Sequence, residues 1–155
     1  MNIKELAIKQ YREIIDSTIS KVSGLVTPTE GWLRTNRKAL KMPTNVILKK
    51  AGIKKSELYR IEKAELEGTL TLNKLKETAK AMDCEFYYAI VPKESIDRTL
   101  KERARRHAVK ILQEANIQMK LEEQATTKAQ IEYQVNEVAD RLVREMPAWF
   151  WDDDK

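Results

Sequence analysis

The chain has only one cysteine and one histidine, Cys84 and His107, among its 155 residues. This scarcity excludes an internal disulfide and a tetrahedral zinc site built from cysteine and histidine. The sequence also lacks a glycine-rich phosphate loop and a nucleophile paired with a base at a recognisable spacing. We therefore expect no catalytic residue, no metal and no cofactor, and we interpret Cys84 as an apolar filler at the end of a helix.

Glycine and proline are scarce as well, with four residues of each, where average usage is about 7% and 5%. So few turn residues disfavour all-β and α/β folds and indicate an all-α fold. No apolar run approaches the roughly 18–20 residues that cross a bilayer, and the charged start MNIKELAIKQ is unlike a secretory signal. We expect a soluble protein with no membrane partner, and its default compartment is cytoplasmic.

Positive charge is abundant but unevenly distributed. The net charge is +5, from 29 Lys and Arg against 24 Asp and Glu. Residues 32–63 hold ten basic and two acidic side chains, a local balance of +8, whereas residues 93–155 hold 12 basic and 13 acidic ones. Because a concentrated basic segment favours a polyanionic partner, nucleic acid is the leading expectation.

Apolar residues at spacings of three and four predict helices over residues 2–22, 31–41, 44–51, 55–64 and 72–82. Thr29 is the expected cap of the second helix, and Thr44 or Asn45 that of the third. Beyond Pro92, one apolar stripe runs from Ile96 to Met119 and another from Ile131 to Met146. These predict two long helices, interrupted near residues 122–127, which form an antiparallel hairpin or a coiled-coil seam.

The segment around Gly52 has the arrangement of a helix-turn-helix. One helix ends at Ala51, Gly52 supplies the positive φ of a tight turn, Ile53 enters the core and a second helix starts near Lys55. Such a second helix enters the major groove of DNA, while neighbouring groups hold phosphates. The expected base-reading residues are Lys55, Ser56, Glu57, Tyr59 and Arg60. The expected phosphate contacts are Arg34, Arg37, Lys38, Thr44, Asn45, Lys49 and Lys63.

Two apolar segments have more than one interpretation. Residues 85–91 are aromatic and β-branched and end at Pro92, which predicts one short strand. Without a second strand in the chain it either lies extended over the helices or pairs with another copy in a homodimer, which suits a palindromic operator. The strand residues are Phe86, Tyr87, Tyr88, Ala89, Ile90 and Val91. At the C-terminus, Trp149, Phe150 and Trp151 either anchor the last helix or bind a partner.

Several blocks of the sequence together carry a resemblance. They are Gly31-Trp32-Leu33-Arg34, Ala39 to Met42, Ala51-Gly52-Ile53, Ile61-Glu62, residues 67–72, Asp83-Cys84, residues 88–92, Ala104-Arg105-Arg106, residues 121–124, Gln130-Ile131, Leu142-Val143 and residues 147–151. The chain resembles the family called mobile mystery protein A, a group of XRE or Cro/C1-type helix-turn-helix regulators encoded beside a Fic-domain protein. The resemblance implies the antitoxin and transcriptional regulator of a toxin-antitoxin pair whose toxin attaches AMP to target hydroxyls.

With this resemblance the expected fold is an XRE-type helix-turn-helix bundle with an N-terminal helix, one short strand and a C-terminal hairpin of long helices. The expected division is residues 1–30 as helix and linker, 31–92 as DNA-binding domain and 93–155 as a hairpin for dimerisation or toxin binding. Val46 stands where XRE members often carry glutamine, and Glu57 replaces a small hydroxyl residue. Two functions therefore stay open: an autoregulatory repressor, or a protein-binding inhibitor or assembly partner whose helix-turn-helix no longer reads DNA specifically.

Overall fold

The computed structural model describes residues 1–121 and 127–153, except for the side chains of residues 116–121. Its elements are α1 (Ile3–Val22), α2 (Trp32–Ala39), α3 (Thr44–Ala51), α4 (Lys55–Glu67), α5 (Leu72–Ala81), α6 (Ile96–Leu121), α7 (Lys128–Glu145) and the short 3-10 helix η1 (Ala148–Trp151). All regular structure in these residues is helical, so the expected all-α class is confirmed. No helix among them is long and apolar enough to cross a membrane. The Met119 side chain of the predicted stripe and most of the matching block at residues 121–124 lie outside the described residues.

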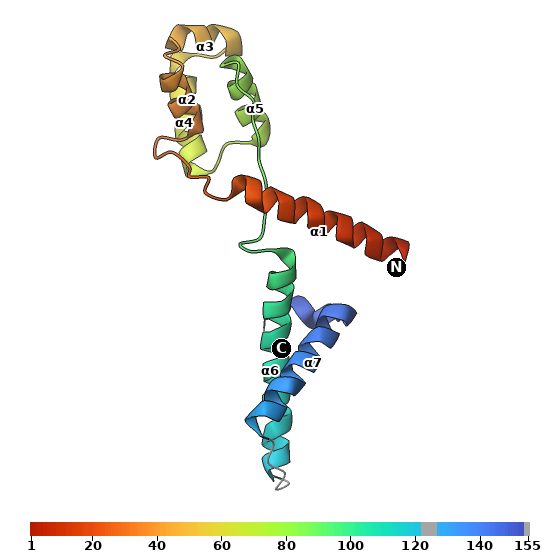
Figure 1. Cartoon of the computed structure of the whole chain (residues 1–155). Coiled ribbons are helices and arrows are strands. Elements are labelled where there is room, and N and C mark those ends of the chain that lie inside the picture. Colours follow the sequence, from red (N-terminus) through yellow and green to blue (C-terminus); the bar gives the residue numbers. More distant parts are fainter. Residues whose placement is uncertain (122–126, 154–155) are drawn as a thin grey trace. The chain divides into compact units, whose positions relative to one another are not determined.

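The chain divides into two compact units. One unit is Ser23–Ile90 and contains α2 to α5; the other joins Met1–Val22 to Val91–Lys155 and contains α1, α6, α7 and η1 (Figure 1). The helix of residues 3–22 thus groups with the C-terminal helices rather than with the basic segment that follows it.

The unit Ser23–Ile90 closes around a small apolar core. α2 packs against α4, and α3 contacts both α4 and α5 (Figure 1). The buried side chains are Leu33, Ile47, Leu58, Ile61, Ala81 and Met82. Each helix contributes only a narrow apolar stripe to this core, so the opposite faces remain polar and exposed.

The start of α2 differs from the expectation, because Thr29 does not cap it. The cap position is Gly31, and no side chain next to it accepts the first amides. Instead the carboxylate of Glu65, from α4, accepts from Trp32 N at 2.7 Å and from Leu33 N at 3.0 Å. A negative charge at the positive end of a helix is favourable, and here it also joins α2 to α4.

Gly31 is required by this arrangement for two reasons. Its φ of 81° and ψ of 164° belong to a region that is essentially restricted to glycine, and an added Cβ would meet Glu65 Oε2 at 2.8 Å. We expect Gly31→Ala to lower the free energy of unfolding by about 2–3 kcal/mol, since it combines backbone strain with displacement of the Glu65 cap. Urea unfolding monitored by circular dichroism measures this loss.

Gly52→Ala is the matched control for Gly31→Ala. Gly52 also has a positive φ, 67°, but no atom lies within 4 Å of its added Cβ. Gly52→Ala should lower the free energy of unfolding by only about 1 kcal/mol, because alanine is tolerated better in the left-handed helical region than in the region occupied by Gly31. Equal losses for the two variants would contradict the role given to Glu65.

α6 and α7 form an antiparallel hairpin, one of the two expected arrangements (Figure 1). Its core consists of Leu100, Ala104, Ala108, Val135, Ala139, Leu142 and Phe150. The small side chains of Ala104 and Ala108 are fully buried, which allows the two helices to approach closely. Outside this core, Arg105 bonds to Glu132 at 2.7 Å and to Asn136 at 3.1 Å.

The expected strand at Phe86–Val91 is not formed within the described chain. These residues form no regular structure and belong to no sheet, because no other segment of the described residues pairs with them. The rings of Phe86 and Tyr88 stack with centroids 6.0 Å apart, while Tyr87 and Ile90 are at least 80% exposed. A strand needs a neighbour for its backbone groups, so pairing with another copy stays a prediction.

Candidate nucleic-acid interface

The turn between α3 and α4 determines how the two helices present their outer faces. Gly52 ends α3 in the left-handed conformation, and Ile53 N donates to Leu48 O at 3.1 Å. Ile53 and Leu48 both pack against the core of this unit. A three-residue turn that contains glycine and a core-facing apolar residue is typical of helix-turn-helix units.

The outer face of α4 carries most of the expected base-reading residues. Leu58, Ile61 and Glu62 are buried on the inner face. Lys55, Ser56, Tyr59, Arg60 and Lys63 are all exposed, and their spacing places them on one side of the helix. Among the described residues, no carboxylate lies within ion-pair distance of Lys55 or Arg60. This face therefore offers hydrogen-bond donors and positive charge to a ligand.

Glu57 is not part of this outer face. Its carboxylate lies 3.4 Å from the Lys74 ammonium group of α5, and its side chain is only partly exposed. We expected Glu57 to read a base or to repel phosphate, and the structure instead holds it in an ion pair beside α5. The spacing of residues along α4 could not reveal this partner, because Lys74 lies 17 residues further along the chain.

Four of the expected phosphate contacts are paired with carboxylates of the same unit. One is Lys63, whose Nζ lies 3.6 Å from Glu67 on the exposed side of α4. The other three lie on α2. Arg34 Nε and Arg37 Nε donate to the two oxygens of Glu62, at 2.9 and 2.8 Å. Lys38 Nζ lies 2.7 Å from both oxygens of Glu30. The bond from Arg34 to Glu62 raises the pKa of that guanidinium, and the bond from Lys38 lowers the pKa of Glu30. These three cations join α2 to α4 and to Glu30. A count of basic residues cannot distinguish such a structural role from binding of a ligand.

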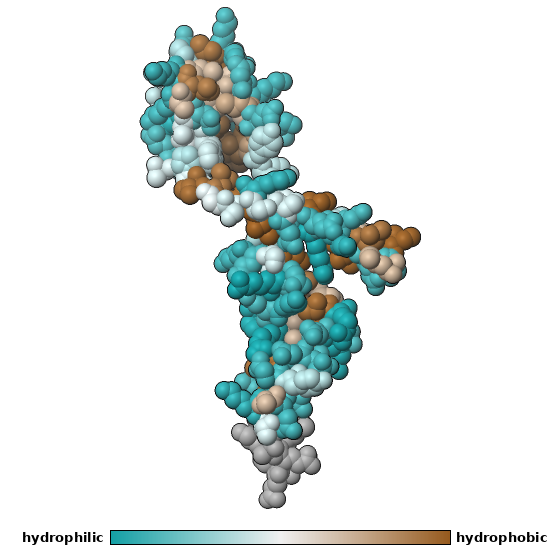
Figure 2. Space-filling model, viewed as in Figure 1, coloured by the Kyte–Doolittle hydropathy of each residue, from teal (hydrophilic) through white to brown (hydrophobic). Residues whose placement is uncertain are grey.

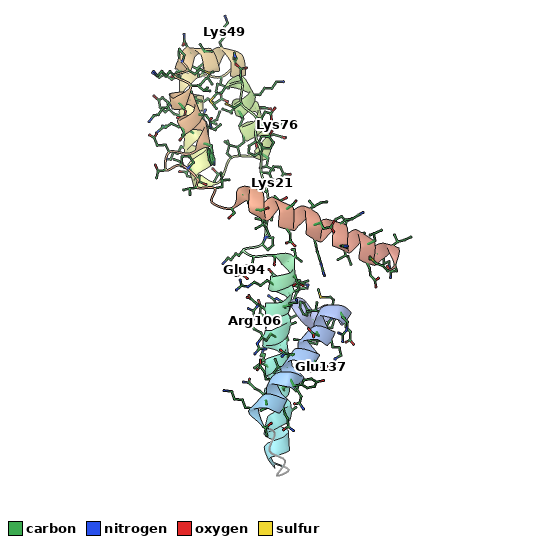
Figure 3. The ribbon with its side chains drawn as sticks, viewed as in Figure 1. Lys21, Lys49, Lys76, Glu94, Arg106 and Glu137 are labelled. Atoms are coloured by element: carbon green, nitrogen blue, oxygen red, sulfur yellow. The ribbon has the colours of Figure 1, made fainter. Side chains whose placement is uncertain are left out.

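Thr44, Asn45 and Lys49 lie on α3, where we expected phosphate contacts. The cap position of α3 is Pro43, not Thr44 or Asn45, and no side chain accepts its first amides. Amide groups at a helix start that lack a protein acceptor are suited to a phosphate oxygen. Lys49 is exposed and projects away from the other helices of this unit (Figure 3).

Two further lysines in the same unit belong with this set but were not expected. Lys41 precedes α3 and has a φ of 47°, and Lys54 is the cap residue of α4. Both are exposed, and no carboxylate among the described residues lies within ion-pair distance of either. Their position in the sequence, just before the predicted starts of two helices, could have identified them as phosphate contacts, because helix starts often bind phosphate.

The expected partner-binding residues at the C-terminus have different surroundings. Phe150 is 0% exposed and belongs to the hairpin core, so it cannot contact a partner and the expectation is corrected for this residue. Its carbonyl oxygen accepts from His107 Nε2 at 2.9 Å and from Arg103 Nη1 at 3.4 Å. Trp149 packs edge-on against His107, and Trp151 is half exposed with Arg103 over its ring. The aromatic cluster therefore anchors η1 on α6, and only Trp151 presents a large exposed surface.

The chain was compared with protein-family models, with curated proteins and with solved structures, and none of them matched.

Proposed function

We propose that this protein is a DNA-binding antitoxin that represses its own operon. The observation that carries the DNA-binding part is the outer face of α4, where Lys55 and Arg60 have no carboxylate partner in the described parts of the chain and Ser56 and Tyr59 lie beside them. A helix with this face fits the major groove, where its donors meet the acceptor edges of bases. α3, with its uncapped start and Lys49, would contact the phosphate backbone.

The finer fold assignment belongs to the same proposal. The turn of Gly52, Ile53 and Lys54 between α3 and α4 supports an XRE-type helix-turn-helix within residues 31–92. A Fic-domain toxin as partner is supported only by the resemblance of the sequence blocks to the mobile mystery protein A family. The C-terminal hairpin, with the exposed ring of Trp151, would provide the surface for that toxin. Pairing of residues 86–91 between two copies would supply a dimer for a palindromic operator.

A test of the DNA-binding proposal uses fluorescence anisotropy with the promoter of the gene and with a scrambled duplex. Wild-type protein should bind the promoter at least about 10³-fold more tightly than the scrambled duplex. Arg60→Ala and Lys55→Ala should each weaken the free energy of promoter binding by about 1–3 kcal/mol, because each removes contacts to base edges. Lys49→Ala should weaken binding to both duplexes and reduce the slope of log K against log salt by about 1.

Lys76→Ala is the matched control for these substitutions. Lys76 is an exposed lysine on α5 in the same unit and lies away from Lys49 of α3 (Figure 3). Its removal should leave promoter affinity nearly unchanged. Equal, weak binding of wild-type protein to both duplexes that vanishes as salt rises would reject sequence-specific recognition.

The second candidate function is a protein-binding inhibitor or assembly partner of the Fic protein. It is favoured by Val46, which places an exposed apolar side chain on α3, and by the engagement of Arg34, Arg37 and Lys38 within the chain. Trp151→Ala distinguishes a surface role from an anchoring role. If it abolishes binding of the Fic protein while the melting temperature is unchanged, the exposed ring binds the partner.

A further inference from the structure

α1 carries an apolar stripe that no described residue of its own unit covers. None of its 20 residues is buried, and Ile3, Tyr11 and Ile14 are 88%, 68% and 60% exposed. Figure 2 shows hydrophobic side chains gathered toward the N-terminal end of this helix. A contiguous exposed apolar surface on a helix marks an interaction site, because leaving it in water is unfavourable.

A different side of α1 is already used within its own unit. Asp16 Oδ1 accepts from the backbone N of Ile96 at 2.9 Å, so α1 provides an acceptor for the first turn of α6. Ile15 and Ile19, on the same side as Asp16, are partly buried. The exposed stripe is formed by Ile3, Leu6, Tyr11 and Ile14 and borders this side, because Tyr11 and Ile15 lie one turn apart.

The spacing of the stripe residues is the same from either end, with steps of three, five and three residues. In an antiparallel arrangement centred between Ile8 and Lys9, Ile3 falls level with Ile14 of a second copy, and Leu6 falls level with its Tyr11. A two-fold interface requires such self-complementarity, because the same patch must contact itself. In antiparallel helix pairs, apolar residues at equal height form the layers of the seam.

The charges of α1 distinguish a second copy from other occupants. The helix carries four basic and three acidic side chains, interspersed along its length: Lys4, Glu5, Lys9, Arg12, Glu13, Asp16 and Lys21. An anionic lipid surface or an acidic protein would be matched by a polar face dominated by lysine and arginine. A nearly neutral helix that carries both signs can approach its own copy with little net repulsion. We propose that α1 pairs with α1 of a second copy in this antiparallel register.

Sedimentation equilibrium of the full chain without DNA tests the interface independently of DNA binding, and variants of α1 distinguish it from pairing of residues 86–91. Ile3→Glu and Ile14→Glu should each raise the dimer dissociation constant at least about 30-fold, because each places two charges in the apolar seam of one dimer. Ser20→Glu adds the same charge to an exposed position of α1 outside the stripe and should have little effect. Because no residue of α1 is buried, circular dichroism should show the fold retained.

Cysteine crosslinking tests the register in a Cys84→Ser background. A copy with Ile3→Cys should crosslink to a differently tagged copy with Ile14→Cys, whereas copies with Ile3→Cys should not crosslink to each other. Crosslinking between the Ile3→Cys copies alone would indicate a parallel pair and overturn the proposal. A monomeric wild type at micromolar concentration, or unchanged dissociation constants in both glutamate variants, would also overturn it. Binding of a monomer to phosphatidylserine vesicles, lost in Ile3→Glu, would assign the stripe to lipid instead.

Discussion

Replacing Glu62 by alanine should lower the free energy of unfolding of the unit Ser23–Ile90 by about 3 kcal/mol. The Glu62 side chain is 3% exposed and accepts from Arg34 and Arg37, whose side chains are 33% and 18% exposed. Without the carboxylate, both guanidinium groups lose their hydrogen-bond acceptor, and Glu30 remains as a negative charge that neither of them bonds to. The expected value is at the lower end of the range for broken buried pairs, since Arg34 can turn toward water.

Glu67→Ala is the matched control, because it removes an acidic side chain from the same helix. Glu67 is half exposed and lies 3.6 Å from Lys63, one turn away. Such a pair contributes about 0.3–0.5 kcal/mol, so the control should be nearly as stable as the wild type. Hydrogen exchange of the amides in α2 and α4 measures both variants within this unit. A loss for Glu62→Ala no larger than that for Glu67→Ala would show that the carboxylate does not hold α2 to α4.

Replacing Phe150 by alanine should lower the stability of the C-terminal hairpin by about 4 kcal/mol. The ring is 0% exposed and packs in the core between α6 and α7, with the His107 ring centroid 5.8 Å away. Its removal leaves a large cavity and loosens the backbone carbonyl that accepts from His107 and Arg103. Hydrogen exchange in α7 and the melting temperature of the full chain measure the loss.

Trp151→Ala provides the comparison for Phe150→Ala within the same aromatic cluster. Trp151 is 54% exposed. Its ring lies edge-on to that of Phe150, with centroids 5.4 Å apart, and the Arg103 guanidinium lies 5.0 Å from its centroid. An exposed cation–π contact is worth about 0.5–1 kcal/mol, so the expected loss is small. If Phe150→Ala were equally mild, the cluster would not anchor η1, and a surface role for the whole cluster would have to be considered again.

The helices could be predicted closely from the sequence because their signals are local. Apolar spacing defined the stripes of α6 and α7, and Gly52 and Pro43 marked the ends of short helices. The same local reasoning failed for the start of α2. Thr29 was the nearest residue suited to cap it, whereas the acceptor came from Glu65, more than 30 residues away. A cap supplied from a distant helix leaves no pattern in the segment that it stabilises.

The candidate interface was predictable in part for the same reason. Helical periodicity placed Lys55, Tyr59 and Arg60 on one exposed face, because the side of a helix on which a residue lies depends only on its position along that helix. The roles of Glu57 and of the arginines in α2 depended on pairing with Lys74 and Glu62, which lie 17 or more residues away. The aromatic residues 149–151 are a similar case. Their composition allowed both anchoring of the last helix and partner binding, and only the burial of Phe150 in the hairpin core shows that this residue is an anchor.

The sequence by itself determined the all-helical class, the approximate bounds of the helices and the basic face of α4. These properties depend on side-chain type and on the repeat of the helix, which act over a few residues. Tertiary structure alone decided which charges are free to meet a ligand and which hold helices together. An ion pair forms where folding brings two opposite charges within about 4 Å, and that distance depends on the packing of whole helices rather than on their order in the chain.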